Sequence, residues 1–417
     1  MRVFSYTAFC LLLSSTAVHA AEPSLAELWE IVKKQQVQID ALSQQLAATK
    51  SSLATNADKI SITEEQITVT ADYLEQVTAR TAERRTRVGG YGELHYNDID
   101  ADNASDTKRI DFHRFVTFIS HDFNARSRFF SEFEIEHSLV KDTSDGSNGG
   151  EIEIEQAYIE FDLNDNHTAK TGLFLVPVGI LNETHEPPTF YGVERNDVEN
   201  IIIPSTWWEA GVAVSGHYDN GLSWDLAVHS GLEMPTSGAS AYRIRSGRQK
   251  VANASADDLA YTLRLKYTGI AGLELAGSYH YQSDPSQMSG DSLADGSLLS
   301  IHGIWQRGPF NLRALWSQWR FDGESSQLGG ADEQTGWYVE PSVRLARRGF
   351  AWGIYTRYED LLGARPRDQF NQWELGLNLW PSDNVVMKLD YRHRNHDLAS
   401  ERGRDFGAVD LGIGYQF

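Results

Sequence analysis

Carboxylates occupy every second position in one stretch of this 417-residue chain. The segment RFFSEFEIE places Glu132, Glu134 and Glu136 between apolar side chains, and Glu160 follows the same alternation in residues 157–163. Successive side chains of a β-strand point to opposite faces, so these glutamates share one face and the apolar residues share the other. A row of carboxylates on one face attracts cations and hydrogen-bonds polar solutes.

Basic residues occupy the equivalent face of later segments. By the same alternation, this face carries Arg264, Lys266, Arg313, Arg344, Arg357, Lys388 and Arg392. Residues 88–206 contain 8 basic and 23 acidic residues, whereas residues 207–417 contain 20 and 25. The pattern predicts an acidic arc that faces a more basic arc across a shared interior, where the field between them orients dipolar solutes. The alternative is a solvated wall of charges without selectivity.

A third group of polar residues lies in GILNETHEPPTFYGVERNDVENIIIPSTWWEAG, residues 179–211, which has no helical or strand period. Ordinary connections have about 4–6 residues, and much longer ones usually serve a function. The polar candidates in this loop are Glu183, His185, Glu186, Tyr191, Glu194, Arg195, Asp197 and Glu199. The spacing of Glu183, His185 and Glu186 matches no zinc motif and offers too few carboxylates for calcium, so we predict no metal site.

Catalytic chemistry has no signature in the sequence. The motifs G-x-S-x-G and H-E-x-x-H and a phosphate-binding loop are all missing from it. The one cysteine, Cys10, lies in the N-terminal apolar run, so the rest of the chain offers neither a thiol nucleophile nor a disulfide. We therefore predict no catalytic residue, no cofactor and no enzymatic activity. The alternative is a membrane lipase that uses a serine and a histidine.

The elements that position the charged residues are segments of about ten residues with period 2, each bounded by turn residues. Their connections alternate between short turns, such as Asn220-Gly221, and long loops, which is typical of a transmembrane β-barrel with an even number of strands. We predict an all-β fold, a 16-stranded antiparallel transmembrane β-barrel over residues 87–417 with a water-filled interior. The sixteen segments are 88–97, 109–122, 127–139, 151–163, 168–178, 207–218, 222–231, 258–268, 272–282, 297–306, 309–320, 335–346, 350–359, 369–380, 384–394 and 407–417.

Tryptophan and tyrosine residues lie near the ends of these segments. Such residues form aromatic girdles at the two membrane interfaces of a barrel, where an apolar ring with one polar atom is most stable. The predicted girdle residues are Trp207, Trp208, Trp305, Trp319, Trp380, Tyr218, Tyr267 and Tyr391.

The residues before the barrel have a different composition. Residues 1–20 combine a basic residue, an apolar run and a small-x-small cleavage signal, which together indicate a secretory signal peptide. Residues 24–82 contain no glycine, and the seam from Leu25 to Ile60 follows alternating spacings of three and four. This heptad pattern predicts an α-helical coiled coil over residues 21–86 that associates with copies of itself. The alternative is a solvated helix without a partner.

The charge balance excludes one class of partner. Without Arg2 the chain has 36 basic and 58 acidic residues, a net charge of −22, which argues against nucleic-acid binding. A barrel in a bacterial outer membrane contacts lipid and lipopolysaccharide instead. The coil is then expected in the periplasm, where it can reach the peptidoglycan layer.

Three stretches of the sequence resemble one known family, the outer-membrane porins related to the phosphate-selective porins O and P. They are FHRFVTFISHDFNARSRFFSEFEIEHS (112–138), EIEIEQAYIEF (151–161) and LFLVPVGILNETHEPPTFYGVERNDVENIIIPSTWWEAG (173–211). The resemblance implies a trimeric sixteen-stranded barrel of a Gram-negative outer membrane. It also implies that the third outer loop, here residues 179–206, folds inward and forms the constriction of the channel.

The function that the resemblance implies is passive diffusion of small hydrophilic solutes and ions. Anion-selective members of the family line their pores with dense arginine and lysine ladders, and this chain departs from that pattern in its first half. The solute therefore stays open. Two other functions also stay open, a structural or adhesive barrel with a plugged lumen and partner-binding loops, and a soluble secreted β-rich binder.

Overall fold

A computed structural model describes residues 85–417, except residues 104, 141–149, 288–294, 323–328 and 348. It also describes eleven helical positions between residues 29 and 50, all of them exposed, in a separate N-terminal unit, Met1–Glu83. The predicted signal peptide and most of the predicted coiled coil lie outside the described residues. Within the described part of the chain, no helix is both long and apolar enough to cross a membrane.

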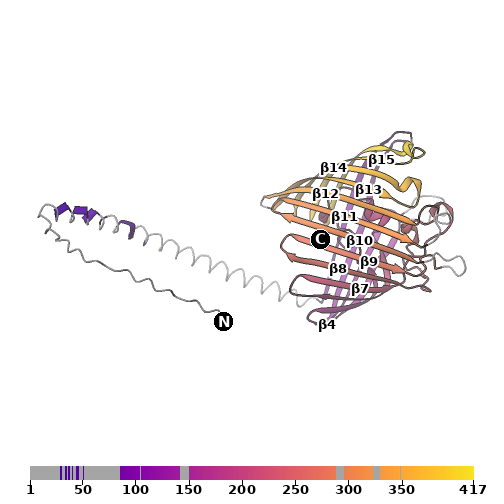
Figure 1. Cartoon of the computed structure of the whole chain (residues 1–417), viewed down its shortest axis with the longest axis horizontal. Coiled ribbons are helices and arrows are strands. Elements are labelled where there is room, and N and C mark those ends of the chain that lie inside the picture. The colour runs from indigo at the N-terminus through magenta and orange to yellow at the C-terminus, as the bar shows by residue number, and fades with distance from the viewer. Residues whose placement is uncertain are drawn as a thin grey trace, which may run out of the picture. The chain divides into compact units, whose positions relative to one another are not determined.

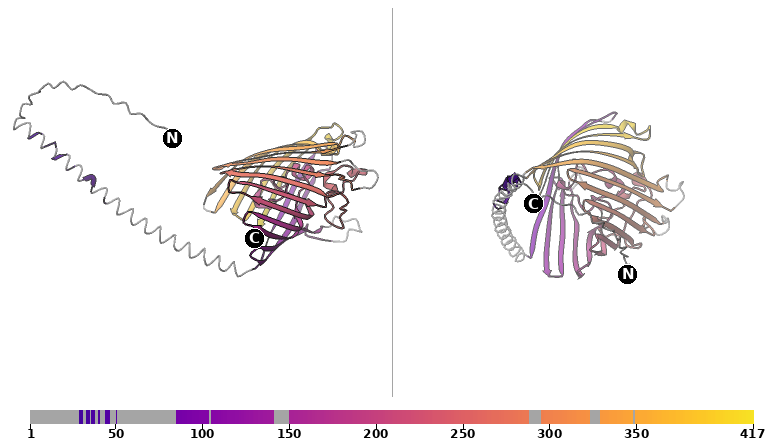
Figure 2. Two further views of the ribbon diagram at one scale, coloured as in Figure 1. Left: turned by 60° about the horizontal axis from the view of Figure 1, so that its bottom comes forward. Right: turned by 60° about the vertical axis from the view of Figure 1, so that its left-hand side comes forward.

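The described residues of the second unit, Arg84–Phe417, form sixteen antiparallel strands that close into one barrel (Figures 1 and 2). Each strand pairs with the next one in the sequence, and β16 returns to pair with β1. The prediction of a 16-stranded barrel is confirmed. The strands are β1 (Thr86–Ala101), β2 (Thr107–Asn124), β3 (Ser127–Glu136), β4 (Ile152–Asn164), β5 (His167–Leu175), β6 (Trp208–His217), β7 (Leu222–His229), β8 (Ala260–Ile270), β9 (Leu273–Gln282), β10 (Gly296–Arg307), β11 (Phe310–Phe321), β12 (Glu333–Arg347), β13 (Phe350–Leu362), β14 (Gln369–Ser382), β15 (Val385–His396) and β16 (Phe406–Gln416).

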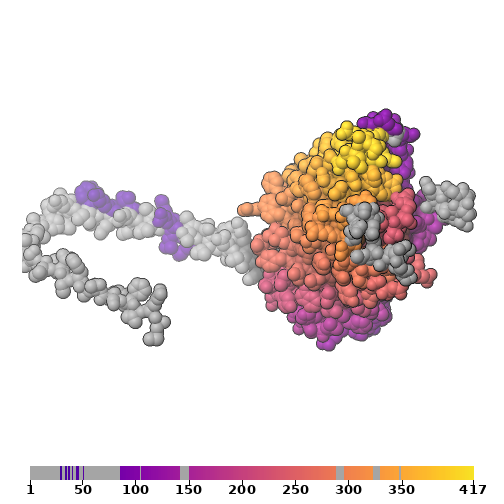
Figure 3. All heavy atoms as spheres, turned by 45° about the vertical axis from the view of Figure 1, so that its right-hand side comes forward, coloured from indigo at the N-terminus to yellow at the C-terminus, as the bar shows by residue number. Residues whose placement is uncertain are grey.

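The outer face of the wall is apolar and its inner face is polar, which is the reverse of a soluble protein. On β8, Leu263 and Leu265 point outward and are 42% and 52% exposed, whereas Thr262 and Arg264 point inward and are 0% and 7% exposed. Outward leucine, isoleucine and aromatic side chains recur on the other strands and cover the continuous outer wall that Figure 3 shows. Soluble monomers rarely expose apolar patches of that extent, so the outer face is suited to lipid.

The connections separate the two ends of the barrel. Short turns join β2 to β3, β4 to β5, β6 to β7, β8 to β9, β10 to β11, β12 to β13 and β14 to β15. The longer loops lie at the other end, and the two longest are residues 176–207 and residues 230–259. We call these two loops L3 and L4. The end with the long loops is the outer end in barrels of this kind.

Two β-bulges interrupt the alternation within the first strands, in addition to register shifts beside the turns that follow β2 and β4. In the β1–β2 pair the register shifts after Glu93, which leaves His113 of β2 as the extra residue. In the β3–β4 pair it shifts after Glu132, which leaves Glu155 of β4 as the extra residue. A bulge re-aims the side chains on either side of it. Strict alternation over residues 109–122 therefore does not predict the inward face of β2.

The predicted aromatic girdle is correct for only part of its residues. Trp305 and Tyr391 do point outward and are 43% and 42% exposed. Trp207, Trp319 and Trp380 are instead 0%, 0% and 3% exposed and contact loop residues in the interior. Position near a strand end does not distinguish a lipid-facing indole from one that packs under an inward-folded loop.

The assignment of the two faces can be tested with Leu265→Arg, because this side chain is 52% exposed on the outer face at the middle of β8. A lipid-facing arginine near the bilayer midplane costs about 2–4 kcal/mol, so the free energy of unfolding should fall by that amount. Urea titration in phospholipid vesicles, followed by tryptophan fluorescence, measures it. The control Lys266→Gln, on the inner face, should change it by less than about 1 kcal/mol. The reverse ranking would mean that β8 is shifted by one residue.

Candidate functional site

L3 lies inside the barrel and crosses its interior. Glu183 at one end of the crossing forms an ion pair with Arg264 of β8. At the other end, Glu194 Oε1 lies 3.2 Å from His95 Nδ1 of β1. Since β8 and β1 lie on opposite sides of the ring of strands, the residues between these two contacts span the lumen.

Glu199 organises L3 from within. Its carboxylate is fully buried and accepts hydrogen bonds from the backbone N–H groups of Ile180 and Leu181, at 2.5 and 2.7 Å. It also accepts one from the hydroxyl of Tyr338 on β12 at 2.9 Å and one from the amide of Asn196 at 3.3 Å. A buried carboxylate is stable only when its oxygens are hydrogen-bonded. Glu199 therefore closes L3 on itself and fastens the loop to the wall.

Apolar side chains of L3 pack against the inner face of β10–β14. The helical turn η3 (Val198–Ile202) and the residues after it provide most of this surface. We call the resulting group the inner apolar cluster; its main members are Val198, Ile201, Ile202, Ile203 and Trp207 from L3, with Trp319, Phe321, Tyr338, Leu361 and Phe370 from the strands. The cluster fills this side of the interior, because sixteen strands alone leave a lumen too wide for strand side chains to close.

L4 also enters the barrel and lies against L3. Arg245 and Arg248 donate hydrogen bonds to backbone carbonyls of L3 just before β6. Burial, with the nearby charges of Arg248 and Arg243, lowers the pKa of Arg245 to about 9. The hydrogen bonds of Arg245 and Arg248 hold L4 against L3 although these two charges repel each other. Three apolar residues of L4 also belong to the inner apolar cluster, Leu232, Met234 and Ile244.

The opposite side of the interior, formed by β1–β5, carries buried carboxylates. Glu132 and Glu134 of β3 and the bulged Glu155 of β4 are 1%, 1% and 2% exposed. We call these three residues the acidic wall. His185 of L3 contacts it, with Nε2 at 3.1 Å from Glu132 Oε1 and 3.9 Å from Glu155 Oε2. Arg114 of β2 lies 3.4 Å from Glu134.

The charge of His185 links L3 to the acidic wall. Burial disfavours the imidazolium, but the attraction and the hydrogen bond of Glu132 outweigh burial, and the pKa of His185 is raised above its ordinary value. A raised pKa makes the attachment strongest below about pH 6.5, the value of an unperturbed histidine. The attachment weakens as the pH rises through the pKa of the folded protein.

Cavities lie along the β1–β5 side, one on each side of L3. The outer cavity has a volume of about 850 Å³ and is lined by the loop-end residues of β1, β2 and β15 together with Glu194, Arg195 and Asp197 of L3. The inner cavity has a volume of about 330 Å³ and lies nearer the short turns. Glu183, His185 and Glu186 of L3 form part of its lining. Between the two cavities, L3 lies against the acidic wall.

Of the remaining predicted loop residues, Tyr191 and Asp197 contact the wall, whereas Arg195 contacts the loop itself. The ring of Tyr191 lies 5.0 Å from that of Tyr355. Asp197 forms an ion pair with Arg394 of β15, and Arg195 donates a hydrogen bond to the carbonyl of His185. Glu183 contacts β8 and His185 contacts β3, so these two residues of the sequence ETHE do not converge on one point.

Six of the seven basic residues that the sequence predicted on the inner face have partners in the interior. Arg264, Arg357 and Arg392 form ion pairs with carboxylates, and Arg344 lies 4.2 Å from the ring of Trp380. Arg313 and Lys388 donate hydrogen bonds to L3 carbonyls, and Lys266 is half-buried on the inner face. Of the predicted acidic residues, Glu160 pairs with Arg128 and Glu136 is half-buried near the outer end of β3.

Sequence reasoning missed several interior residues. Glu155 and His113 are the bulged residues, so no alternation pattern assigns them a face. Glu199 is among the polar loop residues predicted at the constriction, but its contacts within L3 and with Tyr338 cannot be predicted from an irregular loop. His95 and Glu93 do follow the alternation of β1 and could have been assigned inward from it.

The closed barrel, the apolar outer face and the charged interior crossed by a loop define a channel of the outer membrane. The chain belongs to the family described as phosphate-selective porin O and P, whose model matches residues 86–417. It is an outer-membrane porin, a channel for passive diffusion. It is 29% identical over 332 residues to an uncharacterized protein of Aquifex aeolicus, covering 73% of this chain and 74% of that one.

Solved porin structures share the fold at low sequence identity. The anion-selective porin from Comamonas acidovorans is 12% identical, with a TM-score of 0.55 over 80% of this chain and 99% of that chain. Salmonella typhi OmpF in complex with daunomycin is 13% identical, with a TM-score of 0.54 over 80% and 97%. The outer membrane channel DcaP of Acinetobacter baumannii is 12% identical, with a TM-score of 0.52 over 80% and 97%.

The role of Glu199 in holding L3 can be tested with Glu199→Ala. Removal of the carboxylate leaves the buried N–H groups of Ile180 and Leu181 without acceptors, at about 1–3 kcal/mol each. Loss of about 1.4 kcal/mol from the docked state of L3 raises the undocked fraction about tenfold. Limited proteolysis of the folded barrel should therefore cleave L3 at least about tenfold faster. Tyr338→Phe, which removes one hydroxyl and keeps both N–H contacts, is the matched control with a smaller effect. Equal cleavage in Glu199→Ala and the unaltered protein would contradict this role.

Proposed function

We propose that small hydrophilic solutes and ions cross this porin along the β1–β5 side, through a constriction between L3 and the acidic wall. The observation that supports this most directly is the pair of cavities on that side, separated by L3. A solute that moves from one to the other passes Glu194 and Arg195 first and His185 next. The inner apolar cluster makes the β10–β14 side a poor alternative, because water and ions are unstable among buried apolar side chains.

Charges of both signs line this constriction. The strands contribute the carboxylates of the acidic wall, and the loops contribute Arg195 from L3 with Arg245 and Arg248 from L4. Opposed charges in a narrow, partly desolvated passage produce a transverse field. We infer weak ion selectivity and a preference for dipolar or zwitterionic solutes over apolar ones of the same size.

The described arginines on the strands of the wall do not form a ladder of free cations for phosphate. Selective anion passage needs cationic groups that are available to the ion along the path. Arg264, Arg357 and Arg392 are instead neutralised by carboxylates within 3.0 Å or less. We therefore propose a general diffusion pore, in which no residue acts as a catalyst.

We also propose a homotrimer with the coil of residues 21–86 in the periplasm. The support is the heptad seam in the sequence, whose polar positions fix register and oligomer number at some cost in stability. We further propose that the coil reaches peptidoglycan and that the apolar outer face contacts lipid and lipopolysaccharide. Planar-bilayer recordings in which conductance steps occur in groups of three would support the trimer, whereas single steps would count against it.

The opposed charges can be tested by reversal potentials in a KCl gradient. A unit charge about 6 Å from a passing ion in water changes its energy by about 0.7 kcal/mol, a factor of about three in permeability ratio. Glu134→Gln should shift selectivity toward chloride by about that factor, and Arg195→Gln should shift it toward potassium. Glu401→Gln in the outer loop after β15, paired there with Arg404, is the control and should leave the ratio unchanged.

Two results would contradict the proposal. Shifts of the same sign in Glu134→Gln and Arg195→Gln, or no shift in either, would mean that the path avoids this constriction. A correctly folded barrel without conductance would favour the other function that the sequence leaves open, a plugged structural or adhesive barrel. Heat-modifiable gel mobility shows whether each variant is folded.

The raised pKa of His185 gives the pore a pH dependence. Below about pH 6.5 the imidazolium offsets Glu132, and as the pH rises through the raised pKa this positive charge is lost. The preference for potassium should therefore increase with pH, by up to about threefold for one charge at about 6 Å. Reversal potentials between pH 5 and 9 measure it, and His185→Gln should show a much flatter profile. An unchanged profile in His185→Gln would assign the effect to another group.

A further inference from the structure

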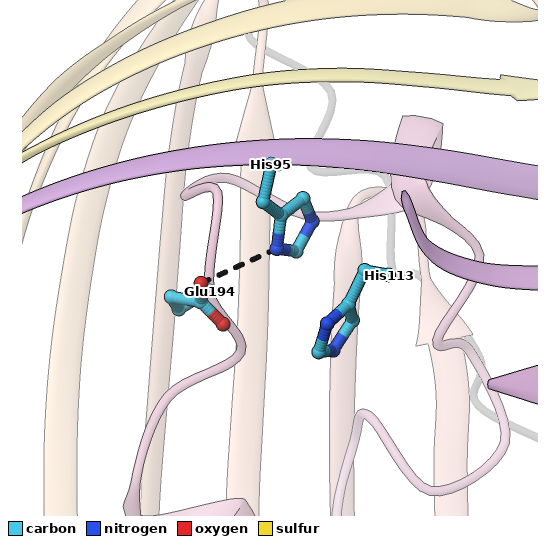
Figure 4. Close-up of side chains that lie close together, drawn as sticks. All are labelled: His95, His113 and Glu194. Carbon is cyan, nitrogen blue, oxygen red and sulfur yellow. Dashed lines mark ion pairs between the residues drawn. The ribbon is translucent and has the colours of Figure 1, made fainter. Parts of the chain in front are cut away.

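Two histidines and a carboxylate meet where L3 touches the barrel wall beside the outer cavity. His95 comes from β1, His113 is the bulged residue of β2, and Glu194 comes from L3. Figure 4 shows the two imidazoles next to each other with the carboxylate of Glu194 turned toward them. One nitrogen or oxygen of each residue can be chosen so that all three lie within 4.8 Å of one another.

The arrangement is unusual for histidines that only fill space. The rings of His95 and His113 stack with centroids 4.6 Å apart and planes at 15°. His95 is 3% exposed, and its Nδ1 lies 3.2 Å from Glu194 Oε1 without the geometry of a hydrogen bond. Buried polar atoms nearly always have a hydrogen-bond partner, and one metal ion between this nitrogen and the carboxylate would give both atoms a ligand bond.

Each of the two histidines has a second carboxylate next to one of its ring nitrogens. Glu93 Oε2 lies 3.2 Å from His95 Nε2, and Asp111 Oδ2 lies 3.1 Å from His113 Nδ1. Carboxylates in this position are the usual outer partners of metal-binding histidines, because they fix the tautomer and raise the basicity of the other nitrogen. With these contacts made, His95 has Nδ1 and His113 has Nε2 to offer to an ion.

We propose that His95, His113 and Glu194 bind one divalent transition-metal ion of the zinc class. Imidazole and carboxylate ligands suit Zn²⁺, Ni²⁺ and Cu²⁺, whereas Ca²⁺ and Mg²⁺ require oxygen ligands. Ligand atoms at about 2.0–2.2 Å from a tetrahedral ion are about 3.4 Å apart, and the candidate atoms here already lie within 4.8 Å of one another. Three protein ligands leave the fourth position for water from the outer cavity.

An ion bound at this site would affect the pore in two ways. Glu194 belongs to L3 and the histidines belong to the wall, so a bound ion ties the loop to β1 and β2. The ion also lies beside the passage, where its charge opposes the flow of other cations. His137, 2.8 Å from Asp111 on the cavity side, provides a second imidazole near His113 along the route of entry.

The proposal goes beyond diffusion of solutes and depends only on L3 lying in the lumen, so its test uses binding rather than conductance. The full chain, folded in detergent and treated with a chelator that is then removed, is titrated with Co²⁺ and followed by visible absorption. We expect one Co²⁺ per chain with the intense bands of a four-coordinate ion, displaced by Zn²⁺. His113→Gln and Glu194→Gln should each weaken binding at least about tenfold, as loss of even an outer-shell partner does.

The matched control is His302→Gln. His302 is a buried inward histidine with a carboxylate partner, Glu274 at 3.2 Å, but it lies on β10 away from the cluster. Its loss should leave Co²⁺ affinity unchanged. The site would be refuted if the unaltered protein bound no Co²⁺, or if His113→Gln and Glu194→Gln bound it as tightly as His302→Gln. Since Glu194 lies in a loop and His113 in a strand, a folding failure in one variant leaves the other to decide.

Discussion

Backbone hydrogen bonding in hydrocarbon is the constraint on which this structure depends. No water is available there to satisfy an exposed N–H or C=O group, so a sheet in a membrane must close on itself. Closure here takes sixteen strands, with β16 returning to β1. A ring of that size has an interior too wide to be filled by the side chains of its own strands. Everything specific to this protein follows from what occupies that interior.

The interior is occupied by the two loops L3 and L4, which make different contacts on its two sides. On the β10–β14 side the loops bury apolar side chains, and the hydrophobic effect holds them there. On the β1–β5 side they meet carboxylates and leave room for water. One loop thus serves as a core element on one face and as a channel lining on the other. Glu199, with four hydrogen-bonded contacts, joins the two roles.

The strands were predictable from the sequence because period 2 and alternating loop lengths are local signals. Their observed ends agree with the predicted segments within a few residues. The interior contacts were less predictable, because they join residues far apart in the chain. No spacing rule connects Glu194 to His95, or Glu199 to Tyr338. The bulge at His113 hid a further residue, since an extra position reverses the alternation that assigns faces.

The contacts of L3 also bear on how the barrel can assemble. The loop is made early in the chain, between β5 and β6, yet it binds residues of β1 and of β15, which is nearly the last strand. Its ion pair with β15 therefore cannot form until the late strands are in place. Docking of L3 is complete only when the strands that carry these partners have joined the barrel. An open sheet that still lacks its last strands would carry this loop incompletely docked.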